Sequence, residues 1–123
     1  MIKIKKTIRS FKYAFAGVWA LFQSENNARV HFLAAAAAVF LGTILKLTAV
    51  EWALVALCIG GVWGAEAFNT ALEKLCDLVS PDIHPQIKAV KDLAAAGVLL
   101  LVLGAVVVGI VVFIPKLWFL FCS

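Results

Sequence analysis

The segment that decides the fold is VWGAEAFNTALEKLCDLV, residues 62–79, in which acidic residues interrupt an otherwise apolar stretch. Glu66, Asn69, Glu73 and Asp77 follow one another at intervals of three or four residues. At about 100° per residue these positions fall within roughly 80° of one another on a helix, so they form one polar stripe. Ionisable residues are costly in hydrocarbon and therefore mark functional sites by default. Three carboxylates and an amide on one face suit the binding of a hard cation and the transfer of a proton.

The rest of the chain is too apolar for a soluble domain. Hydrophobic residues make up 64% of the 123 residues and charged residues only 15%, outside the balance of soluble proteins. Residues 93–114 carry no charge and are long enough to cross a bilayer core of about 30 Å. A soluble bundle of this size has no interior that could bury such a helix on all sides. We predict an all-α integral membrane domain over residues 1–123, with spanning helices at residues 31–50, 52–79 and 88–114.

Residues 1–28 predict an amphipathic helix on the membrane surface. Basic residues alternate here with apolar ones that recur at helical steps of three or four: Ile4, Ile8, Phe11, Phe15, Trp19 and Phe22. A basic helix with aromatic residues on its apolar side is typical of the interface plane, where anionic lipid heads attract it. An ordinary helix packed on other protein is the alternative.

The positive charges predict the orientation of the chain. Most lysines and arginines lie before the first span or beside the loop of residues 80–86, whereas Lys46 and Lys116 fall on the other side. By the positive-inside rule the N-terminus, the polar stripe and this loop are cytoplasmic. That side of the membrane holds ATP and Mg²⁺, so the placement suits phosphate chemistry.

Several short patterns mark the ends of the expected helices. Residues 24–27 resemble a helix cap, and Thr48 and Glu51 bracket a reversal between the first two spans. Pro81 and Pro85 mark the loop before the last span, because each disfavours helix at the preceding residue. Pro115 is expected to end or kink the last helix.

The candidate residues also have ordinary interpretations. The carboxylates of the stripe can pair with lysines of a neighbouring helix, which costs little near the membrane boundary but leaves the deeper Glu66 unexplained. Glu25 and Arg29 have the spacing of a solvated helix salt bridge, which the residues alone favour. Lys88 and Lys91 suit either a membrane anchor or a phosphate clamp.

Other classes of function find little support. Cys58, Cys76 and Cys122 are odd in number and widely spaced, so they indicate small core residues and not a disulfide framework. No Walker A loop, protein-kinase glycine loop, G-x-S-x-G or H-E-x-x-H motif occurs. The low charge content argues against nucleic acid as a partner.

The segments EAFNTALE, DLVSPDIHP and IKAVKDLAAAGVLL resemble the signature region of the prokaryotic diacylglycerol kinase family, small membrane lipid kinases. SFKYAFAG and SENNARVH, upstream, resemble the same family. Together the likeness covers roughly residues 8–103. It implies a bacterial inner-membrane enzyme that transfers the γ-phosphate of ATP to a lipid alcohol with the help of Mg²⁺.

The resemblance also implies roles for individual residues. Glu66 matches the general base that takes the proton of the lipid hydroxyl, and Asn69 matches an active-site amide. Glu25 and Glu73 match the carboxylates that hold the divalent metal of the metal–ATP complex. The positions expected to contact ATP are Tyr13, Glu25, Glu73, Asp82, His84, Lys91 and Asp92. Those expected to contact the lipid are Trp19, Phe22 and Glu66.

The family implies a homotrimer whose sites form between subunits, so Glu25 would meet the stripe of a neighbouring chain. This reverses the salt-bridge interpretation of Glu25. The acceptor is either undecaprenol or diacylglycerol, and SENNARVH and SPDIHP are closer to the undecaprenol branch. Two other functions stay open: a small proton-coupled transporter that uses Glu66, and an assembly subunit without chemistry. The transporter does not account for polar residues on both sides of the cytoplasmic loop, and the assembly subunit does not account for the cost of Glu66.

Overall fold

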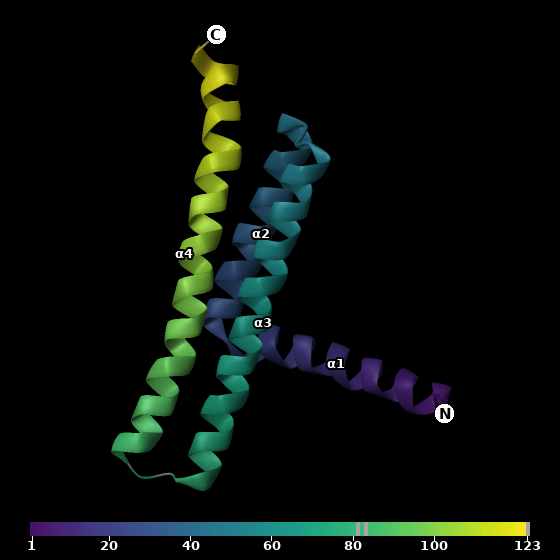
Figure 1. Ribbon diagram of the computed structural model, residues 1–123, viewed down its shortest axis with the longest axis vertical. Helices are drawn as coiled ribbons and strands as arrows, with labels where there is room; N and C mark the ends of the chain where they lie inside the picture. Colours follow the sequence, from purple (N-terminus) through teal and green to yellow (C-terminus); the bar gives the residue numbers. More distant parts are fainter. Residues whose placement is uncertain (81, 83, 123) are drawn as a thin grey trace.

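The structure, a computed structural model, describes residues 1–80, 82 and 84–122, and every regular element within them is an α-helix (Figure 1). The helices are α1 Ile4–Ser24, α2 Asn26–Leu45, α3 Ala49–Val79 and α4 Pro85–Cys122. Helices α2, α3 and α4 are long and apolar enough to cross a membrane. The predicted class is thereby confirmed. Pro81, one of the predicted loop signals, lies outside the described residues, as do Ile83 and Ser123.

The three long helices form a bundle from which α1 projects sideways (Figure 1). Helices α3 and α4 run side by side and make the most extensive pairing, while α2 also contacts both of them. Helix α1 touches α2 and α3 and carries the N-terminus away from the bundle. The chain thus consists of a bundle of three spanning helices and one helix that projects from its side.

Helix α1 ends at Ser24, earlier than the predicted residue 28, because Glu25 has extended backbone angles of φ −112° and ψ 120°. The predicted cap marks this break, but no side chain caps α2; the Ser24 hydroxyl instead donates to the Ala20 carbonyl at 2.7 Å. Leu21 is the one buried residue of α1. The apolar face of α1 is therefore uncovered within this chain, which favours the membrane-surface interpretation over packing on the rest of the chain.

A tight turn joins α2 to α3. Lys46 takes the left-handed conformation at φ 57°, and Thr48 and Glu51 form a capping box, with Thr48 N–H donating to Glu51 at 2.9 Å and Glu51 N–H to Thr48 at 3.2 Å. The capping box thus gives hydrogen-bond partners to the backbone N–H groups of Thr48 and Glu51 at the start of α3. As a result α3 begins at Ala49, before the predicted residue 52.

Helix α4 continues through Pro115 to Cys122, so Pro115 does not end the helix; the predicted alternative, a kink, stays a prediction. A proline removes only one intrahelical hydrogen bond, and spanning helices tolerate this because neighbouring groups can satisfy the freed carbonyl. Lys116 directly follows and binds Glu51 of α3 at 3.0 Å. This ion pair fixes the end of α4 to the start of α3. At its other end α4 begins at Pro85, the first helical position, where proline is favourable.

The chain buries few residues of its own. The interior centres on Leu47, Val55 and Val112, while most large apolar side chains of the three spans are exposed. At 1.5 Å per residue, α3 and α4 are about 47 and 57 Å long, longer than a hydrocarbon core of about 30 Å. Their ends therefore extend beyond the hydrocarbon, and the protein needs lipid or other subunits around its spans.

Candidate active site

The polar stripe of α3 lies on one side of the helix and becomes more exposed along its length. Glu66 is 4% exposed, Asn69 and Glu73 are partly buried, and Asp77 is exposed. Thr70, beside the stripe, is also buried and has a hydroxyl without a hydrogen-bond partner in the described part of the chain. The four residues thus occupy different environments although they share one face.

Glu66 forms a hydrogen bond with a residue that sequence reasoning missed. His31 Nε2 of α2 lies 3.1 Å from Glu66 Oε1, and the two side chains are 20% and 5% exposed. His31 begins an apolar span and has no metal-ligand spacing to another histidine. The signal that could have found it is the rule already applied to Glu66, that an ionisable residue within a span marks function.

Asn69 and Glu73 form a second pair one turn further along α3. The Asn69 Nδ2 amide donates to Glu73 Oε1 at 3.2 Å, and the Asn69 Oδ1 oxygen is buried without a partner among the described residues. A carboxylate beside an unpaired amide oxygen is a set of hard donors, which is what Mg²⁺ prefers. This part of the stripe therefore fits the metal that the resemblance implies.

Within the described residues, no three acidic, histidine or cysteine side chains gather closely enough to hold a metal ion. Glu25 lies at the junction of α1 and α2. The salt bridge predicted between Glu25 and Arg29 is not formed. Arg29 instead donates to the carbonyls of Phe22 and Gln23, the last turn of α1, where a cation satisfies free carbonyls and complements the helix dipole.

Asp77 and Lys91 form an ion pair between α3 and α4 at 2.6 Å. Lys88 and Asp92, one turn apart on α4, form another at 2.6 Å. Three of the four side chains are largely exposed, and that of Lys91 is half-buried at 37% exposure. The ordinary interpretation of the stripe, pairing with a lysine of a neighbouring helix, thus describes Asp77 but not Glu66.

A pocket of about 310 Å³ opens beside the His31–Glu66 pair. Its polar lining residues are Asn27, His31, Glu66 and Asn69, and α4 contributes apolar side chains opposite them. We call it the polar pocket. The other predicted site residues, among those the structure describes, do not line it.

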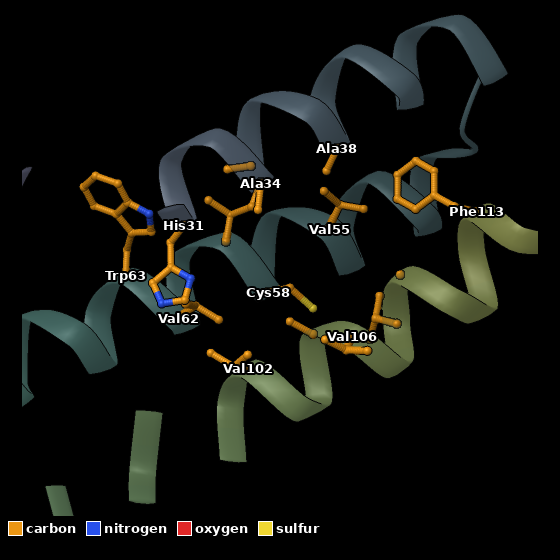
Figure 2. A pocket seen from close by; sticks show the side chains of 15 residues that line it. His31, Ala34, Ala38, Val55, Cys58, Val62, Trp63, Val102, Val106 and Phe113 are labelled. Atoms are coloured by element: carbon orange, nitrogen blue, oxygen red, sulfur yellow. The ribbon is translucent and has the colours of Figure 1, made fainter. Parts of the chain in front are cut away.

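A second pocket, of about 220 Å³, runs between α2, α3 and α4 and is almost entirely apolar (Figure 2). We call it the apolar pocket. Figure 2 shows His31 at one end of it and Phe113 at the other, with Cys58 between them. His31 and Val102 line both pockets. The His31 imidazole therefore lies where the polar pocket meets the apolar pocket.

Part of helix α1 lies beside α3 at the level of Glu66. A groove of about 610 Å³ separates the two helices, lined on α3 by residues between Gly60 and Lys74 that do not include Glu66. The predicted lipid contacts Trp19 and Phe22 stack at 6.1 Å between ring centroids. The Phe22 ring also packs edge to face on Phe32 of α2, with 5.3 Å between the ring centroids, and Phe32 packs in the same way on Trp63 of α3 at 6.5 Å. The surface helix is thus joined to the bundle by aromatic contacts.

The remaining candidates lie in or beside the loop between α3 and α4, or on α1. Tyr13 is 67% exposed. In the loop, the Ser80 hydroxyl donates to the Asp82 carbonyl at 3.3 Å, and His84 Nδ1 accepts from the Gln86 N–H at 3.1 Å. One chain does not bring these groups together with Glu66, so their predicted contact with ATP stays a prediction.

Comparison with known proteins agrees with the resemblance. The sequence profile of the prokaryotic diacylglycerol kinase family matches residues 12–113. An undecaprenol kinase of Bacillus subtilis is 35% identical over 115 residues, which cover 94% of each chain. A diacylglycerol kinase of Synechocystis sp. is 39% identical over 109 residues, 88% of this chain and 62% of that protein.

Proposed function

Because the chain belongs to the prokaryotic diacylglycerol kinase family and is a membrane lipid kinase, we propose that Glu66 is the general base of its reaction. The reaction moves the γ-phosphoryl group of ATP to the hydroxyl of a lipid alcohol. As the new P–O bond forms, the Glu66 carboxylate takes the hydroxyl proton, and ADP leaves with the electrons of the broken bond. The single observation that carries this assignment is the burial of Glu66 at the wall of the polar pocket.

The position of α1 supports this role for Glu66. A basic amphipathic helix lies in the headgroup plane, and α1 crosses α3 between residues 60 and 74. If α1 marks that plane, Glu66 lies at its level, where the hydroxyl of a membrane lipid is found. The stripe beyond Glu66 then extends toward the cytoplasm.

Glu73 is proposed to hold the divalent metal of the metal–ATP complex, with Asn69 as the active-site amide beside it. Phosphoryl transfer depends mainly on positioning and charge neutralisation, and Mg²⁺ keeps phosphates and water beside one or two protein carboxylates. When bound, the metal neutralises charge on the transferring group. The chain's own contribution is the carboxylate of Glu73, held by the Asn69 amide at 3.2 Å, and the carboxylate of Glu25.

Glu25 is proposed to come from a neighbouring subunit of a homotrimer. The support is the family resemblance, which implies that Glu25 and Glu73 both hold the metal, and Mg²⁺ takes one or two protein carboxylates beside the phosphates. The proposed ATP contacts are, from α1 to α4, Tyr13, Asp82, His84, Lys91 and Asp92. We place all of them, with the N-terminus, on the cytoplasmic side.

Undecaprenol is the proposed acceptor. The alignment with an undecaprenol kinase covers 94% of both chains, whereas that with a diacylglycerol kinase covers 62% of the relative. The transporter alternative is not favoured, since both relatives are named as kinases.

The test is phosphorylation by the purified protein in detergent, with labelled ATP, Mg²⁺ and either undecaprenol or diacylglycerol. We expect faster labelling of undecaprenol, and a loss of about 10²-fold or more in Glu66→Gln, the range of general-base catalysis. A thermal unfolding temperature of Glu66→Gln equal to that of the wild-type protein would show that the variant is folded. Faster labelling of diacylglycerol would reverse the acceptor assignment, and full activity of Glu66→Gln would remove the base role.

A further inference from the structure

The proposed reaction assigns no role to His31. Among the residues that the structure describes, however, His31 is the one hydrogen-bond partner of the Glu66 carboxylate. Its side chain is four-fifths buried and its Nε2 lies 3.1 Å from Glu66 Oε1. The two residues are 35 positions apart and belong to different spans. A specific polar contact therefore holds the proposed base.

The proposed base role defines the direction of this hydrogen bond. A general base acts in its ionised form, and an ionised carboxylate accepts hydrogen bonds and donates none, so in that form the proton of the bond belongs to His31 Nε2. The bond uses Oε1 and leaves Oε2 without a described partner. It also restricts the rotation of a side chain that otherwise has several rotatable bonds.

We propose that His31 is the positioning residue of the general base: its Nε2–H fixes Glu66 Oε1 so that Oε2 faces the hydroxyl of the lipid. This inference rests on the proposed base role of Glu66. The location supports it, because His31 lines both the polar pocket and the apolar pocket. A lipid whose hydroxyl meets Glu66 must place its first carbon atoms where these two spaces join.

A purely structural role for His31 is less consistent with its surroundings. Beyond His31, α2 faces the apolar pocket with Ala34, Ala35 and Ala38, and α3 with Val55 and Val62, so small apolar contacts already line this side of both helices. An imidazole adds a buried polar group that must be paired. The group it pairs with is the one that we assign to the chemistry.

Two variants separate positioning from packing. His31→Gln keeps an N–H donor at nearly the place of Nε2, whereas His31→Phe keeps an aromatic ring and loses the donor. We expect His31→Phe to lose about 10- to 100-fold in kcat, since misplacement by about 1 Å can cost 10²-fold, with the KM for ATP unchanged. His31→Gln should recover most of that loss. Equal kcat in the two variants, or a loss confined to KM, would overturn the proposal.

Chemical rescue gives an independent readout. In His31→Ala, added imidazole should raise kcat several-fold, because the deleted ring leaves a space next to the polar pocket. The wild-type protein and Glu66→Gln should not respond to imidazole. Absence of rescue in a folded His31→Ala protein that still binds ATP would count against positioning.

The tautomer of His31 tests the bond without any activity. The chain has two histidines, so a nitrogen-15 spectrum of the wild-type protein and of His31→Gln assigns both. We expect a protonated Nε2 on His31. A bare Nε2 would overturn the proposal even if the kinase is active, whereas an active Glu66→Gln with the expected tautomer would refute only the base role on which the proposal rests.

Discussion

Glu66 and Asp77 are carboxylates of one helical stripe that differ in depth and in partner. Asp77 is exposed and binds the Lys91 ammonium at 2.6 Å, an arrangement that contributes little free energy. Glu66 is 4% exposed and contacts an imidazole and not a lysine. A buried carboxylate without a permanent cation is costly, and this cost is what a structural role cannot explain.

At the same scale, Glu73→Ala tests the metal assignment. Removal of the carboxylate that Asn69 holds at 3.2 Å should raise the Mg²⁺ concentration for half-maximal rate by about 10-fold or more, or abolish turnover, because Mg²⁺ has few protein ligands to lose. A Mg²⁺ titration of the initial rate measures this. Asp77→Asn, one turn away on the same helix, is the control and should keep the wild-type titration. An unchanged titration in Glu73→Ala would contradict the assignment.

Local spacing could predict the stripe but not its partners. Glu66, Asn69 and Glu73 share a face because the helix repeats every 3.6 residues, and a short window of sequence contains that information. The contact of His31 with Glu66 joins residues 35 positions apart. It depends on how α2 packs against α3, which no local pattern encodes.

At the scale of elements, the ion pair of Asp77 with Lys91 joins the end of α3 to the start of α4. If Lys91 also contacts ATP, the variants Asp77→Asn and Lys91→Ala should differ in their KM for ATP. Asp77→Asn should lower the free energy of unfolding by less than about 1 kcal/mol, as exposed pairs do, and leave the KM for ATP unchanged. Lys91→Ala should raise the KM for ATP by about 10-fold, the loss of a charge-assisted phosphate contact. Equal effects of both variants on KM would mean that Lys91 acts only as a structural tie.

The turn between α2 and α3 depends on a close approach at Gly42. A Cβ atom there would lie 2.7 Å from Trp52 Cη2 and 2.9 Å from Leu47 Cδ1, closer than packed carbon atoms allow. Gly42→Ala should therefore lower the free energy of unfolding by about 1–3 kcal/mol, the usual cost of overpacking. Gly104→Ala on α4, where nothing lies within 4 Å of the new Cβ, should be neutral or stabilising by up to about 1 kcal/mol. Thermal unfolding in one detergent measures both, and equal shifts would contradict this account.

The spans were predictable as elements, but of their ends only that of α3 at Val79 was predicted to the residue. The three apolar stretches define α2, α3 and α4 because a helix is the form in which an isolated segment can satisfy its backbone in lipid. Pro115 does not end α4, because neighbouring groups can satisfy the carbonyl that a proline frees within a spanning helix. In α4 the helix continues to Cys122, with Lys116 held by Glu51 at 3.0 Å.

At the scale of the whole molecule, the spans leave most large apolar side chains exposed, so lipid or other subunits must cover them. The proposed homotrimer would cover part of this surface. It would also bring Glu25 of one subunit to the polar stripe of the next, because each subunit of a symmetric ring repeats the same contact around the axis.

Mixed oligomers test this assembly directly. Glu25→Ala and Glu73→Ala should each be nearly inactive, because each removes one metal-binding carboxylate from every site. If the two proteins are unfolded together and refolded at equal amounts, random mixing gives about one site in four with both carboxylates intact. We therefore expect activity near a quarter of wild type in the mixture. As a control, Glu25→Ala mixed with the double variant Glu25→Ala/Glu73→Ala should stay inactive, since every subunit then lacks Glu25. No recovery in a mixture whose differently tagged subunits co-purify would place Glu25 and the stripe of one site in the same chain.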